Sequence, residues 1–485
     1  MNITDLKPEL VWRYFHEITQ VPRPSKKEEK ILAYLKKFAE DRKLDYSQDE
    51  AGNIVIRKAA TPGYENLKTV VLQSHVDMVC EKNNDTVHNF DTDPIRTVID
   101  GEWVRAEGTT LGADNGIGVA AELALLDDDS LEHGPIECLF TVDEETGLTG
   151  AMNLAPGFIK GTILLNLDSE DEGEMFIGCA GGMGTTATFN YTTEATPADY
   201  FYGKINVSGL KGGHSGGDIH VGLGSANKIL NRALYAIREK MPLVLAQIDG
   251  GNLHNAIARE AMALIGVPMN RKEELAILIN ELDADVRTEL EVVDPNVKVT
   301  LSSVENPTRI IDRDTTQRLI SALYACPHGV MGMSHAIEGL VETSTNLASI
   351  KMKENNKIVV ETSQRSSSES LKADVGNTVK SVFDLAGAEV EVRDGYPGWS
   401  PNPNSPILQV TIDAYKKLFG KEPAVKAIHA GLECGLFLSK YPYLDMVSFG
   451  PTLRDVHSPV ERMEIATVDL FWRHLLEVLK NIPKA

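Results

Sequence analysis

The stretch Leu139-Phe-Thr-Val-Asp-Glu-Glu-Thr-Gly147 is the part of the sequence that best indicates both fold and chemistry. It continues an apolar run that starts at Ile136, the pattern of a buried strand. The run ends in Asp143-Glu-Glu145, so the strand carries carboxylates to the rim of a sheet. Adjacent carboxylates raise one another's pKa unless a cation lies between them. A metal bound by one glutamate, with the other free as a base, removes this conflict. A solvated acidic turn is the simpler alternative.

Length, charge and cysteine content restrict the class of protein. The 485 residues exceed what one hydrophobic core usually holds, so we expect two or more domains. A formal net charge of −22 argues against nucleic acid or an anionic membrane surface as a partner. Five scattered cysteines without Cys-x-x-Cys spacing indicate a reducing compartment. Residues 1–24 have no apolar core, and no run reaches the roughly 20 apolar residues of a membrane helix. We therefore expect a cytoplasmic protein.

Strand and helix patterns alternate in the first part of the chain, which predicts an α/β layer with a parallel or mixed sheet. The expected strands are at 53–58, 67–74, 136–142 and 161–167, and the expected helices at 8–18, 25–42 and 117–126. Ser25-Lys-Lys-Glu28 has the pattern of a capping box that opens the second helix.

The pattern changes near Thr188, where a second domain is expected to begin. Residues 188–399 predict an inserted α+β domain with the outline of two related β-α-β halves. Residues 1–187 and 400–485 would then form the two segments of the first domain. The turn-rich segment Gly395–Pro403 and the region around Thr188 are candidate hinges.

Five residues that can bind a metal stand at the ends of predicted elements: His75, Asp114, Glu145, Asp168 and His457. The carboxyl ends of strands in an open α/β sheet form the ligand crevice, so we expect these side chains to converge. Asp77, two residues after His75, can accept the free ring N–H of a metal-bound histidine. Nitrogen and carboxylate ligands without cysteine suit zinc, with manganese or cobalt as substitutes. Each residue alone has an ordinary role, such as a helix cap for Asp114, so the set carries the argument.

These motifs resemble those of the co-catalytic zinc peptidases of the aminoacylase/carboxypeptidase clan: His75-Val-Asp77, Gly112-Ala-Asp-Asn-Gly116, Asp143-Glu-Glu-Thr-Gly147, Asn166-Leu-Asp-Ser-Glu170 and His457-Ser-Pro459. Within the clan, three more motifs resemble those of the bacterial aminoacyl-histidine dipeptidases, also called cytosol non-specific dipeptidases: Asp85-Thr-Val-His88, Lys211-Gly-Gly-His-Ser-Gly-Gly217 and His429-Ala-Gly-Leu-Glu-Cys-Gly435. The resemblance covers almost the whole chain. It implies an α/β, mixed-sheet zinc-peptidase catalytic domain with an inserted α+β lid domain.

The resemblance also implies a role for each metal-site residue. The chain would bind two zinc ions per subunit, with Co²⁺ or Mn²⁺ as substitutes. Asp114 would bridge the two ions, next to a peptide bond that the family holds cis. The other ligands form two pairs: His75 with Asp168, and Glu145 with His457. Glu144 would be the general base that takes a proton from the attacking water and passes it to the leaving amine. Two cations would lower the pKa of that water towards neutrality.

In the inserted domain, the resemblance implies a lid that closes before chemistry and supplies polar groups to the substrate. His214 would stabilise the oxyanion, and Arg365 would bind the C-terminal carboxylate of the substrate. Asn255 would contact substrate, whereas Gly431 and Glu433 would line the pocket from the first domain, with Glu433 near the amino end. In several relatives the lid histidine comes from a partner subunit, so we expect a homodimer. Two related halves in one lid would also allow a monomer.

The leading hypothesis is a zinc dipeptidase that cleaves dipeptides with a free N-terminus, including Xaa-His and β-alanyl-histidine. The nearest alternative is an N-acyl-amino-acid deacylase or a carboxypeptidase of the same clan, and the glycine spacing of residues 429–435 favours the dipeptidase. A metal-free scaffold protein would be expected to lose ligands or the base, and here every position holds a competent residue. A two-metal phosphohydrolase would need a lid rich in lysine and arginine, against which the acidic balance argues.

Overall fold

The computed structural model describes residues 2–485, which form two compact units. The first unit comprises the chain up to Gly178 together with Pro401–Ala427 and Leu432–Ala485. The second unit comprises Cys179–Ser400 and the short segment Ile428–Gly431. Within residues 2–485 there is no helix of the length and apolarity that a membrane crossing requires.

The boundaries differ from those expected in two places. The first unit ends at Gly178 instead of residue 187, because β9 (Gly181–Asn190) is one continuous strand of the second unit's sheet. A hinge around Thr188 is wrong, since this residue lies inside β9 and pairs with Val359 on one side and Glu389 on the other. Gly431 belongs to the second unit, which contradicts its expected place in the first domain.

The first unit is built on an eight-stranded mixed sheet with the strand order β1-β2-β6-β3-β7-β23-β8-β22. In that order the strands are β1 (Asp45–Gln48), β2 (Ile54–Lys58), β6 (Ile136–Thr141), β3 (Val70–His75), β7 (Ile163–Asn166), β23 (Asp445–Ser448), β8 (Glu174–Cys179) and β22 (Ala424–Ile428). Strands β6, β3, β7 and β23 run parallel, so their carboxyl ends share one edge. Every residue of β3, β6 and β7 is buried, as parallel strands covered on both faces require. The predicted α/β class with a mixed sheet is confirmed.

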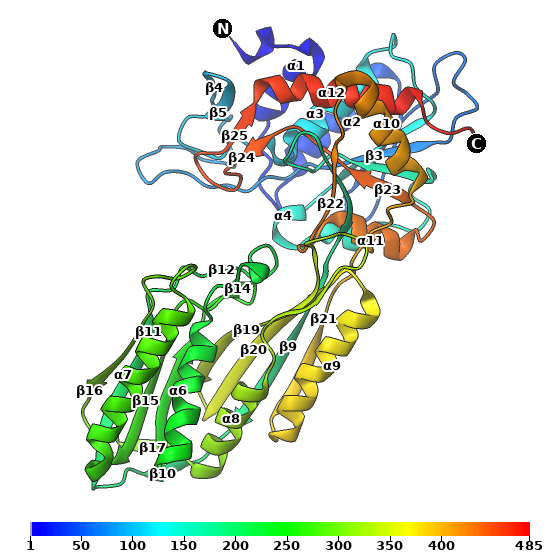
Figure 1. Ribbon diagram of the computed structural model, residues 1–485. Coiled ribbons are helices and arrows are strands. Elements are labelled where there is room, and N and C mark those ends of the chain that lie inside the picture. The colour runs from blue at the N-terminus through cyan, green and yellow to red at the C-terminus, as the bar shows by residue number, and fades with distance from the viewer. Residues whose placement is uncertain (1) are drawn as a thin grey trace. The chain divides into compact units, whose positions relative to one another are not determined.

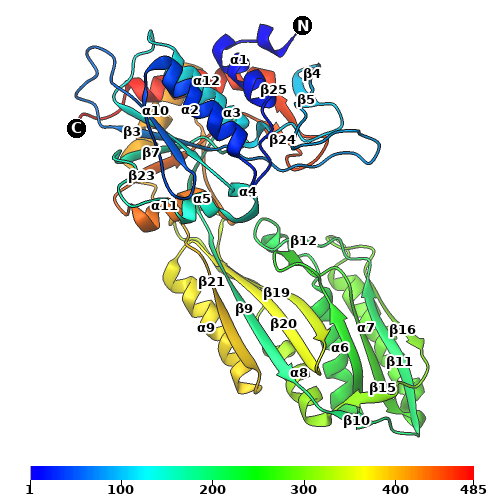
Figure 2. The same ribbon diagram turned by 180° about the vertical axis from the view of Figure 1, so that it is seen from behind.

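Helices cover this sheet, and a small second sheet completes the unit. The helices are α1 (Glu9–Thr19), α2 (Glu29–Arg42), α3 (Ala113–Asp127), α4 (Glu144–Gly147), α5 (Thr149–Met152), α10 (Pro406–Phe419), α11 (Glu433–Lys440), α12 (Ile465–Lys480) and the 3-10 turn η1 (Ile3–Asp5). The small sheet has the order β24 (Leu453–Arg454), β25 (Arg462–Glu464), β5 (Trp103–Ala106) and β4 (Thr97–Asp100). Helix α3 packs against β3 and α1, and α10 packs against β23 and α12. Figures 1 and 2 show α3, α10 and α12 on one side of the large sheet and α11 on the other.

The capping box expected at the start of α2 is wrong. The helix begins at Glu29, and no side chain caps it. The Ser25 hydroxyl instead donates to Oδ2 of Asp77 at 2.8 Å, and the Glu28 carboxylate accepts the N–H of Asp143 at 3.0 Å. Both side chains therefore hold the loops that leave β3 and β6, where the candidate site lies.

The second unit is built on a nine-stranded sheet with the order β16-β11-β15-β13-β19-β20-β9-β21, and β18 pairs with β19 beside this path. The strands are β11 (Tyr200–Ser208), β13 (Val244–Gly250), β15 (Ala261–Pro268), β16 (Lys298–Ser303), β18 (Gly329–Met333), β19 (Val341–Lys353), β20 (Lys357–Ser366) and β21 (Glu389–Tyr396), in addition to β9. Its helices are α6 (Ala226–Lys240), α7 (Lys272–Glu289), α8 (Arg313–Ala325) and α9 (Glu369–Leu385). Short elements complete it: β10 (Thr193–Ala195), β12 (Gly213–His214), β14 (Ala256–Ile257), β17 (Arg309–Ile311), η2 (Ile219–Val221) and η3 (Met269–Arg271).

This sheet contains the same topology twice. The first half runs β11-α6-β13-β15-α7-β16, and its fourth, first, third and second strands lie side by side. The second half runs β9-α8-β19-β20-α9-β21 with the same strand order, and the first half is inserted after its β9. The halves join through antiparallel pairing of β13 and β19, at Asp249 with Lys351 and Gly250 with Ile350. The two related halves predicted from the sequence are present, each as a complete β-α-β-β-α-β unit.

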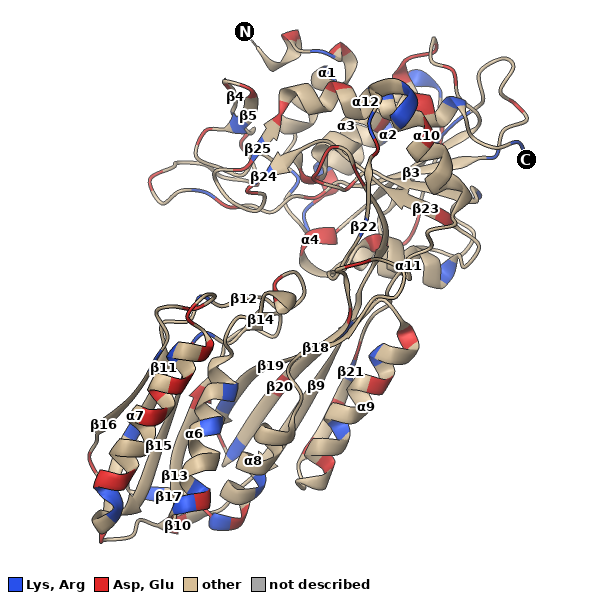
Figure 3. Ribbon diagram, viewed as in Figure 1, with Lys and Arg blue, Asp and Glu red and all other residues tan. Residues whose placement is uncertain are grey.

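The four helices of the second unit cover one face of its sheet, as Figure 1 shows. One apolar core lies between them and the strands, with Leu230, Leu275 and Leu319 fully buried in it. The outward faces of the helices are charged. Figure 3 shows acidic positions along α7, where Glu273 and Glu274 are exposed while Leu275 faces the core. This amphipathic pattern is typical of a helix that packs one face on a sheet and exposes the other to solvent.

Candidate functional site

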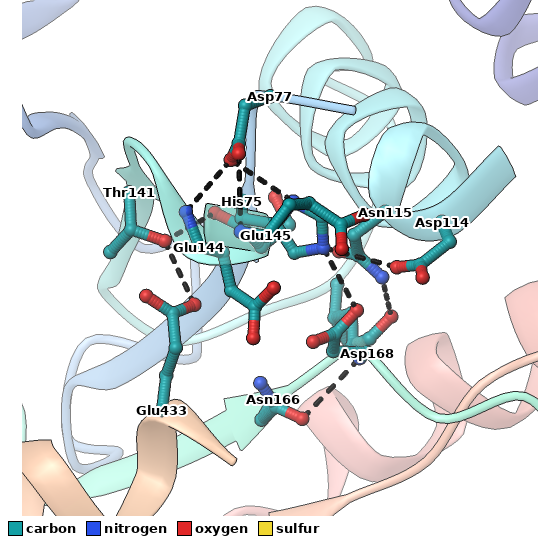
Figure 4. A network of polar contacts seen from close by, with 12 residues as sticks. His75, Asp77, Asp114, Asn115, Thr141, Glu144, Glu145, Asn166, Asp168 and Glu433 are labelled. Carbon is teal, nitrogen blue, oxygen red and sulfur yellow. Dashed lines mark hydrogen bonds and ion pairs between the residues drawn. The ribbon is translucent and has the colours of Figure 1, made fainter. Parts of the chain in front are cut away.

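The five predicted metal ligands converge at the carboxyl edge of the first unit's sheet. Nε2 of His75 lies 3.0 Å from Oδ1 of Asp114 and 3.4 Å from Oδ1 of Asp168. Nε2 of His457 lies 3.1 Å from Oδ2 of Asp114 and 3.0 Å from Oε2 of Glu145. Asp114 therefore places one oxygen beside each histidine, as a carboxylate shared by two ions must. Figure 4 shows His75, Asp114, Glu145 and Asp168 facing one another.

The side chains in this cluster fit divalent cations. Ligand atoms of His75, Asp114 and Glu145 all lie within 4.8 Å of one another. The second carboxylate oxygen of Glu145, Oε1, is buried and has no hydrogen-bond partner among residues 2–485. Two imidazoles and three carboxylates form a typical donor set for zinc, manganese or cobalt. The peptide bond between Asp114 and Asn115 is cis.

The cluster concentrates negative charge, which shifts the pKa of its members. Burial lowers the pKa of His75, but the Asp168 and Asp114 carboxylates outweigh burial and raise this pKa well above its usual value. Hydrogen bonds to Asp114 and Glu145 raise the pKa of His457 to about 11. Burial raises the pKa of Asp168 to about 7. The direction of these shifts shows that the cluster attracts positive charge, as a site for cations requires.

Glu144 and Asp77 lie next to the ligands. Burial raises the pKa of Glu144 well above its usual value. Asp77 is fully buried and accepts the N–H groups of Glu144 at 3.1 Å and Glu145 at 3.2 Å. Its Oδ1 also lies 3.4 Å from Nδ1 of His75. Asp77 therefore orients the candidate ligand His75 on β3 and holds the short helix α4, which carries the candidate ligand Glu145 and Glu144.

Glu461 anchors the loop that carries Asp114, a role that no local pattern in the sequence indicates. Its buried carboxylate accepts the N–H groups of Leu111 at 2.7 Å, Gly112 at 3.0 Å and Ala113 at 2.8 Å. These residues form the turn at which α3 begins, where backbone donors have no partner within the helix. Glu461 therefore supplies the acceptor that fixes the entry to α3.

Arg23 ties the same loop to the end of β3. Its buried guanidinium donates to the carbonyl oxygens of Val76 and Asp77, both at 2.9 Å, and of Gly112 at 2.5 Å. Burial lowers the pKa of Arg23, and the Asp77 and Glu461 carboxylates oppose this shift. The loops that carry His75 and Asp114 are thus linked through one buried cation. Only the Pro-Arg-Pro context of Arg23 marked it in the sequence, and that context names no partner.

We expect Glu461→Ala to lower the free energy of unfolding by about 3 kcal/mol, because three buried N–H groups lose their acceptor. Urea unfolding of the metal-free protein measures this difference. Glu422→Ala is the matched control, since Glu422 is exposed and its ion pair with Lys416 lies at the surface. A loss of less than about 0.5 kcal/mol would show that the N–H groups find other acceptors.

Glu433, at the start of α11, presents a buried carboxylate to the same cluster. Its Oε2 accepts Nε2–H of Gln73 at 2.6 Å and the hydroxyl of Thr141 at 2.9 Å. Its Oε1 is buried, and no residue of the described chain forms a hydrogen bond with it. Burial raises the pKa of Glu433 to about 8. Figure 4 shows Glu433 below Thr141 and near Glu144. One oxygen is thus available to a cationic or hydrogen-bonding group of a ligand.

In the second unit, His214 has a defined tautomer. Its Nδ1 accepts the N–H groups of Gly217 at 3.0 Å and Gly216 at 3.3 Å, so the proton of the neutral ring is on Nε2. Burial lowers the pKa of His214, and Arg365 lowers it further. Nε2 of His214 lies 3.4 Å from a terminal nitrogen of Arg365. Two donors therefore lie side by side, an arrangement that suits a shared acceptor such as an oxygen of a ligand.

Arg365 is a buried cation without a counter-ion. Its side chain is 8% exposed, and no ion pair within 4.0 Å links it to another residue of the described chain 2–485. NH1 donates to the hydroxyl of Tyr396 at 2.7 Å, whereas Nε is buried and has no hydrogen-bond partner within residues 2–485. Burying an unpaired charge is costly, so this guanidinium is suited to an anionic ligand.

The two remaining predicted residues also lie in the second unit. Strand β12 pairs with β14, which places Asn255 beside His214, and both line a cavity of about 680 Å³. Gly431 touches the ring of Tyr396 closely: a Cβ there would lie 2.7 Å from Cε2 of the ring. The second unit thus brings together His214, Arg365 and Tyr396, and Tyr396 was not predicted.

Comparisons with known proteins extend these observations. Residues 71–481 match the peptidase family M20/M25/M40. The chain is 45% identical over 482 residues to the cytosol non-specific dipeptidase of Escherichia coli strain K12, covering 99% of both proteins. The crystal structure of the aminoacylhistidine dipeptidase from Vibrio alginolyticus has a TM-score of 0.94 and 46% identity, covering 100% of this chain and 99% of that chain. A tripeptidase from Staphylococcus aureus has the same fold. Its crystal structure has a TM-score of 0.58 and 17% identity, covering 98% of this chain and 99% of that chain.

Proposed function

The chain belongs to the peptidase family M20/M25/M40, and we propose that it hydrolyses dipeptides with a free N-terminus, including Xaa-His and β-alanyl-histidine. The observation that carries this proposal is the placement of Asp114 between His75 and His457, with Glu144 beside them. Two relatives whose names describe dipeptidases, at 45% and 46% identity over the full chain, support the substrate class. The resemblance indicated by the motifs is confirmed.

We propose that two zinc ions occupy the metal centre, with Co²⁺ or Mn²⁺ as substitutes. His75 and Asp168 would hold one ion, Glu145 and His457 the other, and Asp114 both. The orphaned oxygen of Glu145 and the two carboxylate–histidine contacts of Asp114 support this division. Such ions polarise the scissile carbonyl and make water acidic enough to attack near pH 7.

Glu144 is the proposed general base. It accepts a proton from the attacking water and passes it to the leaving amine. Its backbone N–H is held by Asp77, which also faces His75, so the base and a ligand are fixed by one buried carboxylate. This shared support orients the base and the ligand relative to each other.

Four residues are proposed to bind the substrate. Arg365 binds the C-terminal carboxylate, for which its lack of a counter-ion is the support. His214 donates from Nε2 to the developing oxyanion. Glu433 accepts from the substrate's amino group through its free oxygen. Asn255 contacts the peptide from the cavity that it shares with His214. Gly431 remains a proposed pocket residue, now from the second unit.

The free oxygen of Glu433 also bears on the nearest alternative. An N-acyl amino acid has no ammonium group and would leave this buried carboxylate unpaired, which favours the dipeptidase over the deacylase. A cytoplasmic location is proposed, supported by the name of the Escherichia coli relative. The homodimer stays a prediction. The complete repeat within one chain supports the alternative, in which His214 acts in its own subunit.

We expect zinc-loaded protein to release free amino acids from β-alanyl-histidine and other Xaa-His dipeptides. Release should fall to background with a chelator and return when zinc is added back. N-acetylated forms of the same dipeptides should be poor substrates, because they lack the amino group. Amino acid analysis measures each release. Hydrolysis of N-acyl amino acids without hydrolysis of any dipeptide would establish the deacylase instead.

A further inference from the structure

Tyr396 lies across the sheet of the second unit from Arg365. Both residues pair with Gly182 of β9, Arg365 from β20 and Tyr396 from β21. Strands two apart in a sheet are separated by roughly 10 Å, so side chains at one register level meet only if they reach over the middle strand. Gly182 has no side chain, and the Tyr396 hydroxyl accepts NH1–H of Arg365 at 2.7 Å.

Two glycines, Gly182 and Gly431, leave room for the ring of Tyr396. A Cβ at Gly182 would lie 2.8 Å from Cε1 and 3.0 Å from the hydroxyl oxygen. A Cβ at Gly431 would lie 2.7 Å from Cε2 and 3.1 Å from Cζ. Real Cβ atoms do not approach a ring so closely, so either methyl group would displace the phenol. The ring position therefore depends on glycine at both places.

The Tyr396 contact decides which edge of the guanidinium is available. NH1 is occupied by the phenol, whereas Nε has no partner and NH2 faces only the protonated Nε2 of His214. The Nε and NH2 donors form the side-on edge that binds a carboxylate with two parallel hydrogen bonds. Without the phenol, the planar guanidinium is free to turn about the Cγ–Cδ and Cδ–Nε bonds of the side chain. Its Nε–NH2 edge would then no longer be held in one orientation.

We propose that Tyr396 is a positioning residue that fixes Arg365 so that its Nε–NH2 edge receives the C-terminal carboxylate of the substrate. Gly182 and Gly431 act through Tyr396 by giving its ring room. The inference rests on the proposed role of Arg365 as the carboxylate-binding residue, and it adds a specificity determinant to that site.

The test compares each dipeptide with its C-terminal amide, which lacks the carboxylate. Tyr396→Phe keeps the ring and removes only the hydroxyl. We expect it to lower the acid-to-amide ratio of kcat/KM by about 10-fold, through a higher KM for the acid, because a hydrogen bond to a charged group is lost. The ratio of the inhibition constants of histidine and histidinamide should change by the same factor. This second ratio measures binding of the carboxylate in the absence of turnover. Thermal unfolding of the variant should match the parent.

Arg365→Ala separates failure of the inference from failure of the proposed function. If Arg365→Ala lowers the ratio strongly and Tyr396→Phe leaves it unchanged, the positioning role is overturned while the carboxylate site stands. If Arg365→Ala also leaves the ratio unchanged, the proposed carboxylate site itself is wrong.

A double-mutant cycle tests whether Gly431 acts through the ring of Tyr396. Gly431→Ala alone should lower the acid-to-amide ratio, and adding it to Tyr396→Ala should cause no further loss. Additive losses would show that Gly431 acts independently of Tyr396. Gly332→Ala is the matched control, because a Cβ at Gly332 meets nothing within 4 Å.

Discussion

Glu144→Gln is expected to lower kcat on the order of 10³-fold while the protein keeps its full metal content, because the substitution removes the proton acceptor and preserves the side-chain shape. Glu144 is the residue of the cluster suited to this task. Its neighbour Glu145 lies 3.0 Å from His457, whereas Glu144 has no ion pair with either histidine among the contacts of residues 2–485. Steady-state kinetics and metal analysis of the same sample measure the two quantities.

Two controls sharpen this experiment. Glu144→Asp shortens the base but keeps a carboxylate, so part of the activity should remain. Glu50→Gln changes an exposed glutamate and should leave kcat unaltered. Activity of Glu144→Gln within about 10-fold of the parent, with metal bound, would contradict the base assignment.

Local signals in the sequence predicted the regular elements well. The strands expected at 53–58 and 136–142 are β2 (Ile54–Lys58) and β6 (Ile136–Thr141), because short apolar runs bounded by polar residues are a local signal. Asn355 and Asn356 turn the hairpin between β19 and β20, and both have positive φ, of 60° and 53°. Asparagine tolerates this region better than most residues, so the turn could be recognised without tertiary information.

Non-local contacts explain the errors. Ser25 and Glu28 match a capping box by spacing, but each finds a better partner on a distant loop, at Asp77 and Asp143. The start of β9 is rich in glycine and shows no alternation of apolar and polar residues. The expected boundary between the units therefore lies later in the chain, at residue 187. Those glycines are required by close contacts, such as the ring of Tyr396 against Gly182.

In the candidate site, too, local patterns predict some residues, whereas others depend on distant partners. Ligands at strand ends could be predicted because a sheet aligns the ends of its parallel strands, as it does for His75 and Asp168. The residues that hold the loops in place could not. Glu461 is 350 positions from Leu111, and Arg23 is 53 positions from Val76. A single charged residue in one sequence carries no sign of such a partner.

Asp114→Asn is the second prediction with a large effect, and it tests the shared ligand directly. Both carboxylate oxygens of Asp114 face a histidine, at 3.0 Å for His75 and 3.1 Å for His457. The amide keeps the shape but loses the charge and one of the two oxygens. We therefore expect the affinity for both ions to fall, with hydrolysis reduced on the order of 10³-fold or more.

Asp168→Asn provides the contrast that makes the Asp114 result specific. Asp168 lies near His75 alone, at 3.4 Å, so its loss should weaken one ion and leave the other bound. Metal analysis after dialysis against a weak chelator should then give about one ion per chain for Asp168→Asn and fewer for Asp114→Asn. Equal occupancy in the two variants would mean that Asp114 serves a single ion. In that case the two histidines would meet at one carboxylate for a structural reason, and the assignment of Asp114 as a ligand of both ions would have to be withdrawn.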